Sequence, residues 1–90
     1  MNTLMKKTVH IKQQKALQGL LKMVRNNCGL SQVELATRLG KPQSFVSKIE
    51  AGERRLDLPE LQQVCIALGI ALEDFVRRYV VLTKYERGGE

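Results

Sequence analysis

Apolar residues recur at every third or fourth position along most of this 90-residue chain, a spacing that places them on one side of an α-helix. Breaks that contain Gly, Asn or Pro divide the pattern into separate helical segments. The first segment predicts a helix over residues 10–27, ended by Asn26-Asn27-Cys28-Gly29. Its expected core positions are Leu17, Leu20, Leu21 and Val24.

The second segment begins at Ser31, with Glu34 three residues later, which is a capping box that satisfies the unpaired N–H groups of a helix start. Gly40 ends this segment, because glycine adopts the left-handed conformation of a helix exit at little cost. The apolar positions between these two signals are Val33, Leu35, Ala36 and Leu39. We therefore expect a short helix with one apolar side.

A third segment follows at once, with Pro42 near its first position, where the missing N–H of proline costs nothing. It runs from about residue 43 to 51, and Val46 and Ile49 point inward. The residues expected to point outward are Gln43, Ser44, Ser47 and Lys48. Two short helices joined by a Gly-containing turn form a helix-turn-helix, in which the small Ala36 permits a close approach.

Two further segments complete the pattern. Asp57 with Glu60 forms an N-terminal cap, and the core face behind it consists of Leu61, Val64, Cys65 and Leu68. The last segment begins at Ala71, and its inward positions are Leu72, Phe75, Val76 and Tyr79. The chain is therefore expected to be an all-α domain of five helices, over residues 10–79.

Apolar residues continue beyond the point where such a domain is complete. An exposed apolar patch usually marks an interface, so residues 80–90, the end of the C-terminal helix and a tail, include a candidate dimer contact. The expected interface residues are Tyr79, Val80, Val81, Leu82 and Tyr85. The alternative is that the last helix packs more deeply along the first.

The distribution of charge favours a nucleic-acid partner. The net charge is +6, but residues 1–55 carry eleven Lys and Arg against three acids, whereas residues 56–90 carry four against six. The basic half contains the helix-turn-helix, as expected of a DNA-binding protein. Residues 1–9 are a basic lead, which is either a disordered arm or an extension of the first helix.

Other classes of function lack their characteristic residues. His10 is the only imidazole, and the carboxylates are dispersed, so no catalytic constellation is present and no enzyme activity or cofactor is expected. Cys28 and Cys65 have no metal-ligand spacing; Cys65 is expected in the core, and Cys28 partly exposed. Without an apolar stretch for a signal peptide or a membrane span, we expect a cytoplasmic protein.

Three stretches resemble the Cro/C1-type (XRE) helix-turn-helix family, namely residues 29–36, residues 39–40 and residues 46–53. The resemblance implies a compact, lambda-repressor-like five-helix domain with the helix-turn-helix at its second and third helices. It also implies a small bacterial or phage-type regulator, more often a repressor, that binds double-stranded DNA as a dimer on a near-palindromic operator.

The resemblance and the outward orientation together suggest roles for individual residues. The expected base contacts are Gln43, Ser44, Ser47 and Lys48. The expected contacts to the DNA backbone are Gln32, Arg38, Lys41, Phe45, Arg54 and Arg55. From the family pattern we also expect an ion pair between Arg25 and Glu50 that holds the first helix against the third.

A second class of function remains open at this point. An antitoxin or another protein-interaction module would use the apolar C-terminal helix to bind a different protein, with DNA binding secondary.

Overall fold

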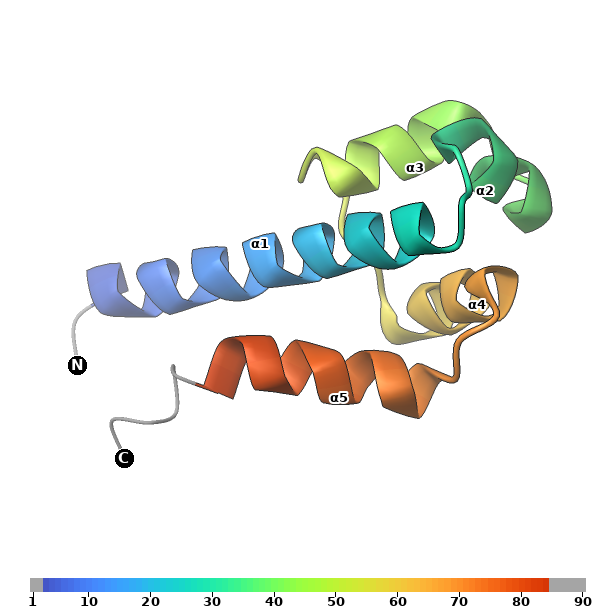
Figure 1. Cartoon of the computed structure of the whole chain (residues 1–90). Coiled ribbons are helices and arrows are strands. Elements are labelled where there is room, and N and C mark those ends of the chain that lie inside the picture. Colours follow the sequence, from blue (N-terminus) through green and yellow to red (C-terminus); the bar gives the residue numbers. More distant parts are fainter. Residues whose placement is uncertain (1–2, 85–90) are drawn as a thin grey trace.

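The structure is a computed structural model that describes the backbone of residues 3–84 and the side chains of residues 11–84 (Figure 1). The part of the chain that it describes is all-α. The elements in order are α1 (Thr3–Asn27), α2 (Gln32–Leu39), α3 (Gln43–Glu50), α4 (Leu58–Leu68) and α5 (Leu72–Thr83). This confirms the predicted fold class, with the helix-turn-helix at α2 and α3.

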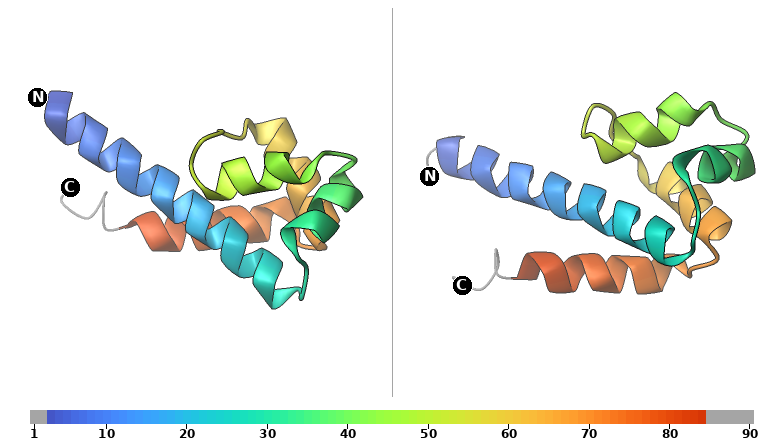
Figure 2. Two further views of the ribbon diagram at one scale, coloured as in Figure 1. Left: turned by 90° about the horizontal axis from the view of Figure 1, so that it is seen from above. Right: turned by 45° about the horizontal axis from the view of Figure 1, so that its top comes forward.

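The helices form two groups on opposite sides of α1. The last helix, α5, lies beside α1 and runs in the opposite direction, while α3 packs on the other side of α1 and α2 packs against α3 (Figures 1 and 2). Helix α4 contacts both α2 and α5 near the C-terminal end of α1. Helix α1 therefore separates the helix-turn-helix from α5.

The core lies where these helices meet. It contains the expected inward positions of α1, α3 and α4 except Leu17 and Leu61, which are partly buried and pack against it, together with Phe75, which is fully buried on α5. Its buried members are Leu20, Leu21, Val24, Leu30, Leu35, Ala36, Val46, Ile49, Val64, Cys65, Leu68 and Phe75. Aliphatic side chains supply all of this core except one aromatic ring and one thiol.

Helix α1 begins at Thr3, seven residues before the predicted start at His10. The apolar pattern placed this start too late, and the extension of the first helix into residues 1–9 was one of the two alternatives kept open. Apolar periodicity reports burial, so a helix start outside the core has no stripe to detect. Residues 1–18 contain neither Gly nor Pro, so nothing in the sequence breaks the helix there. The basic lead thus extends the first helix from residue 3.

Two valines predicted to face the core are exposed. Val33 is 53% exposed and Val76 is 37% exposed. Each residue adds about 100° around a helix, so Val33 lies on the side of α2 roughly opposite Leu35, two positions later. Val76 likewise lies about a quarter turn from Phe75, which is the buried apolar residue of α5.

Candidate nucleic-acid interface

The helix-turn-helix is built from local signals that the sequence predicted. Ser31 Oγ accepts a hydrogen bond from the backbone N–H of Glu34 at 3.0 Å, and Glu34 Oε1 accepts one from the N–H of Ser31 at 2.9 Å. Gly40 has φ +66 and ends α2. Pro42 is the N-cap residue of α3 and lies just outside the helix. Ser31 therefore marks the start of α2, Gly40 marks its end, and Pro42 marks the start of α3.

The outward side of α3 is polar and accessible. Gln43, Ser44 and Lys48 are exposed, whereas Ser47 is half-buried and its hydroxyl donates to the carbonyl of Ser44 at 3.3 Å. Val46, on the opposite side of the helix, is buried in the core. The four predicted base-contacting residues therefore come from one continuous side of α3.

The predicted ion pair between Arg25 and Glu50 is present. Arg25 Nε donates to Glu50 Oε2 at 2.6 Å, and Nη2 donates to Oε1 at 2.9 Å. The two side chains are only 7% and 4% exposed, so the pair is shielded from water. Arg25 Nη1 also donates to the carbonyl of Leu30 at 2.7 Å. One guanidinium thus ties α1 to the end of α3 and to the turn before α2.

The electrostatics of this pair favour the charged forms of both groups. Burial raises the pKa of Glu50, but hydrogen bonds from Arg25 and Gln32 outweigh it and leave this pKa below its usual value. The hydrogen bond to Glu50 raises the pKa of Arg25 further above its ordinary value. Arg25 and Glu50 therefore both remain charged at neutral pH.

A chain of hydrogen bonds leads from this pair to the outward side of α3. Gln32 Nε2 donates to Glu50 Oε1 at 3.0 Å, and Gln43 Nε2 donates to Gln32 Oε1 at 3.4 Å. Gln32, predicted as a DNA backbone contact, is half-buried and joins the two helices of the motif. The amide of Gln43 is thereby linked through Gln32 to the buried ion pair.

The arginine of α2 is directed toward α4. Arg38 Nη1 donates to the carbonyl of Ala67 at 2.9 Å, near the C-terminal end of α4. The guanidinium is exposed, but in this conformation it lies beside α4 and not beside the outward side of α3.

Phe45 is the centre of a charged cluster between α3 and α4. Its ring is half-buried and packs against the core. Lys41 Nζ lies 5.5 Å and Arg54 Cζ 4.6 Å from the ring centroid, distances at which cations are attracted to an aromatic face. Arg54 is also paired with Glu60 through contacts of 2.6 and 3.2 Å.

The pairing of Arg54 with Glu60 was missed by the sequence analysis. Glu60 was assigned to the cap of α4, and it does serve there, because Oε1 accepts from the N–H of Asp57 at 3.0 Å. The only indication of this pair in the sequence was that Arg54 and Glu60, six residues apart, have opposite charges. The sequence could not predict that the loop before α4 turns the Arg54 side chain back onto the first turn of that helix.

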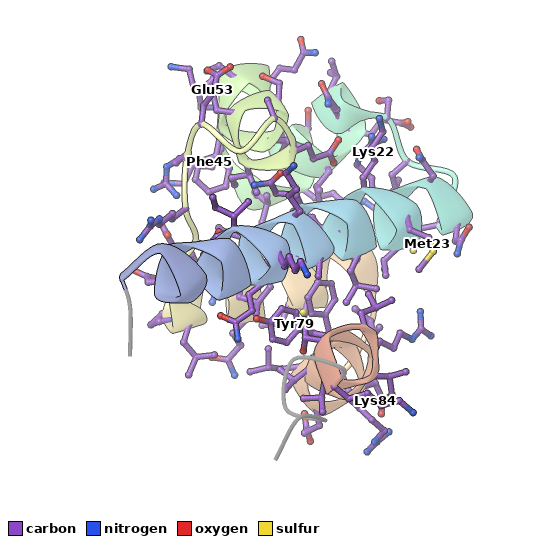
Figure 3. All side chains as sticks on the ribbon, turned by 90° about the vertical axis from the view of Figure 1, so that its left-hand side faces the viewer. Lys22, Met23, Phe45, Glu53, Tyr79 and Lys84 are labelled. Carbon is purple, nitrogen blue, oxygen red and sulfur yellow. The ribbon has the colours of Figure 1, made fainter. Side chains whose placement is uncertain are left out.

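Apolar side chains are exposed on the side of the molecule away from α3. Met23 of α1 is exposed, as are Val80, Val81 and Leu82 of α5, of which Val81 is 56% exposed. A shallow groove between the two helices is lined by Leu20, Met23, Val81 and Leu82. In Figure 3, Phe45 and Glu53 lie on the α3 side of α1, and Tyr79 and Lys84 on the α5 side.

The predicted dimer residues differ in how accessible they are. Val80, Val81 and Leu82 are exposed, whereas Tyr79 is half-buried and packs against the core. Tyr85 lies outside the described residues. Met23 was not predicted, because its place on α1 opposite α5 follows from the packing of the two helices.

Other kinds of site find no support in the described part of the chain. No group of three or more His, Cys, Asp or Glu side chains there could hold a metal ion. Among the same residues, none of the helices has the length and apolar character required to cross a membrane. Cys28 is exposed and Cys65 is buried, as expected.

A paired set of short helices with an exposed polar side on the second, held by a buried ion pair, defines a helix-turn-helix domain. The family model described as helix-turn-helix matches residues 21–75. An XRE-family like protein from Pseudomonas syringae pv. tomato str. DC3000 is 42% identical, with a TM-score of 0.80 over 87% of this chain and 95% of that chain. The chain belongs to the XRE family of helix-turn-helix DNA-binding transcription regulators.

Two other solved structures are similar in fold. The clp gene regulator ClgR from C. glutamicum is 25% identical, with a TM-score of 0.71 over 79% of this chain and 91% of that chain. The restriction–modification controller protein C.Esp1396I, solved as a tetramer in complex with its natural 35 base-pair operator, is 20% identical, with a TM-score of 0.73 over 79% and 93% of the two chains. No match was found among curated protein sequences.

Proposed function

We propose that this regulator is a repressor that binds a near-palindromic operator as a homodimer, with α3 in the major groove. The placement of α3 as the base-reading helix is best supported by the hydrogen-bond chain from the buried Arg25–Glu50 pair through Gln32 to Gln43. An amide held in one orientation loses less freedom when it binds, which increases both affinity and selectivity.

Base readout is assigned to the outward side of α3. The amide of Gln43 can donate and accept together, which matches N6 and N7 of adenine. Lys48, one helical turn and a residue further along, can donate to O6 or N7 of guanine. Ser44 and Ser47 can bond to either bases or phosphates. Together these residues can read a few base pairs, about as many as one half of an operator contains.

The proposed contacts to the DNA backbone surround this side of α3. They are Gln32, Arg38, Lys41, Phe45, Arg54 and Arg55. Such contacts supply affinity and register but carry no sequence information. Gln32 is engaged by Glu50, Arg38 by the Ala67 carbonyl and Arg54 by Glu60, so each needs a rearrangement or a remaining donor to bind phosphate.

Selection of bound duplexes from a random DNA pool tests this assignment and yields the half-site. We expect enrichment of two related half-sites about one helical turn apart, roughly 10 base pairs from centre to centre. If the bound duplexes contained each sequence at the same frequency as the starting pool, that result would contradict sequence-specific binding. Repression is tested separately, with a reporter whose promoter carries the selected site.

The homodimer is proposed to form through the exposed apolar residues near the end of α5. Two copies would cover Val81 and Leu82, which otherwise remain in water at a cost of about 25 cal/mol per Å² of apolar surface. Replacing both residues by Ser should give monomers in sedimentation, while a matched double change of Gln62 and Gln63 on α4 to Ser should not. A dimer that persists in the first variant would place the contact elsewhere.

The same surface supports the second candidate, an antitoxin or a related module whose main partner is another protein. The groove beside Met23 and Leu82 is bordered by Arg77 and Arg78, so it suits a partner with acidic side chains around an apolar centre. Purification of the tagged protein from its native cells discriminates the two candidates. A stoichiometric second protein, lost in the Val81 and Leu82 variant, would support the antitoxin reading over the homodimer.

A further inference from the structure

Arg54, one of the cations proposed to contact the DNA backbone, is occupied by an acid of the same chain. Its Nη2 donates to Glu60 Oε2 at 2.6 Å, and its Nη1 donates to Glu60 Oε1 at 3.2 Å and to the carbonyl of Arg55 at 2.7 Å. Three donor contacts of a guanidinium that has five N–H groups are therefore made within the protein. One face of the same group lies over the Phe45 ring.

The position of Arg54 is at the edge of the proposed DNA surface. Its backbone N–H donates to the carbonyl of Lys48 at 3.2 Å, which keeps it next to the last base-facing residue of α3. Phe45, on which it stacks, follows Ser44 directly on α3. In Figure 3, Phe45 and Glu53, the residue before Arg54, both lie on the α3 side of α1.

Glu60 is well suited to retain the guanidinium. Its carboxylate is held by the cap of α4, since Oε1 also accepts from the N–H of Asp57 at 3.0 Å. Hydrogen bonds from Arg54 and from the Asp57 backbone lower the pKa of Glu60 to about 2, so it carries its charge throughout the neutral range. A carboxylate and a phosphate can each accept two parallel hydrogen bonds from one guanidinium, so they compete for the same donors.

We propose that Glu60 competes with DNA phosphate for Arg54 and thereby limits the sequence-independent affinity of this protein for DNA. The competitor is fixed in place on α4, whereas a phosphate must displace it and also approach its negative charge. The proposed contact of Arg54 with phosphate is therefore weakened in the wild-type chain and reaches its full strength once the carboxylate is removed. This inference rests on the proposed DNA-binding function.

The test uses the full chain and a random-sequence DNA duplex longer than two helical turns, titrated at several salt concentrations. Glu60→Gln removes the charge but keeps a residue that can serve in a capping box. Glu53→Gln removes an equal charge from the loop before α4 and is the matched control. Arg54→Gln is made alone and together with Glu60→Gln, and thermal unfolding verifies that each variant is folded.

We expect Glu60→Gln to bind random DNA about twofold to fivefold more tightly than Glu53→Gln does, the range of an exposed ion pair. The plot of log K against log salt should steepen by up to about 0.9, the slope of one added phosphate contact. Adding Arg54→Gln should abolish both effects, whereas Arg54→Gln alone should change wild-type binding less than it changes the binding of Glu60→Gln.

Three results would overturn the inference. The first is a Glu60→Gln affinity no higher than that of Glu53→Gln, and the second is a gain that survives in the Arg54→Gln background. The third is an NMR signal of the Arg54 guanidinium that shifts as far when DNA is added to the wild type as it does when DNA is added to Glu60→Gln. If the wild-type protein shows no salt-dependent DNA binding, the proposed function is refuted together with this inference. If the wild type binds DNA but one of the three results is found, only the inference about Glu60 fails.

Discussion

Replacing Glu50 by Ala should be among the most destabilising single changes on this surface. The change leaves Arg25 charged, 7% exposed and still next to the Leu30 carbonyl, but without its two carboxylate contacts at 2.6 and 2.9 Å. Gln32 loses an acceptor at 3.0 Å in the same step. A buried charge deprived of its partner cannot recover its lost hydration unless the helices separate.

The expected loss is about 3–5 kcal/mol, the cost of breaking a buried ion pair by removing one partner. That is a large fraction of the roughly 5–15 kcal/mol by which domains are stable. For a domain of this size, each kcal/mol shifts the melting temperature by about 4–8 °C, so the midpoint should fall by about 12 °C or more.

Thermal unfolding followed by circular dichroism measures this effect, with urea unfolding as a second measure. Asp74→Ala is the control, because it removes one partner of the exposed Arg77–Asp74 pair, which solvent already screens. The double change Arg25→Met with Glu50→Leu should lose less stability than Glu50→Ala alone, since an apolar pair leaves no unpaired charge.

The reasoning would be refuted if Glu50→Ala lowered the midpoint no more than Asp74→Ala does. It would also be refuted if the apolar double variant were less stable than Glu50→Ala, because the destabilisation would then not arise from an unpaired buried charge.

Three further predictions concern acid stability, base readout and thiol reactivity. Burial raises the pKa of Glu50, but hydrogen bonds from Arg25 and Gln32 outweigh it and leave this pKa below that of an unfolded glutamate. The contribution of Glu50 to the free energy of unfolding is therefore complete above the unfolded pKa of about 4.3 and is lost as pH falls through the lower pKa of the folded state. Urea unfolding across the acid range should therefore show a shallower fall in stability for Glu50→Gln than for wild type, and an equal fall would contradict this. Gln43→Ala should relax selection at one base position by about 1–3 kcal/mol without changing the others, and an unchanged preference would exclude the amide as a base contact. Burial raises the pKa of the Cys65 thiol to about 11, so iodoacetamide at mildly alkaline pH should modify exposed Cys28 first, whereas equal labelling by mass spectrometry would show that the core opens readily.

Local signals in the sequence predicted the parts of the fold that depend on near neighbours. Both capping boxes, Ser31 with Glu34 and Asp57 with Glu60, are present. Gly40 ends α2 in the left-handed conformation. Each of these features is decided by residues within one helical turn, so the sequence is sufficient to find them.

Features that depend on distant packing were harder to predict. Arg25 and Glu50 were paired only through the family resemblance, because nothing within either helix indicates a partner 25 residues away. The contacts of Arg38 with the Ala67 carbonyl and of Arg54 with Glu60 were not predicted at all. The roles assigned to the residues of α3 remain predictions until DNA is bound.

The shortness of α2 and α3 limits what can be removed from this protein. Each has eight residues, well below the roughly 12–15 at which an isolated helix becomes even marginally stable in water. A synthetic peptide spanning residues 31–52 would keep the Ser31 cap and the Gly40 turn but would lack Arg25 and the α1 surface. It should be unstructured in isolation, so a minimal DNA-reading fragment cut from this chain must include the C-terminal half of α1.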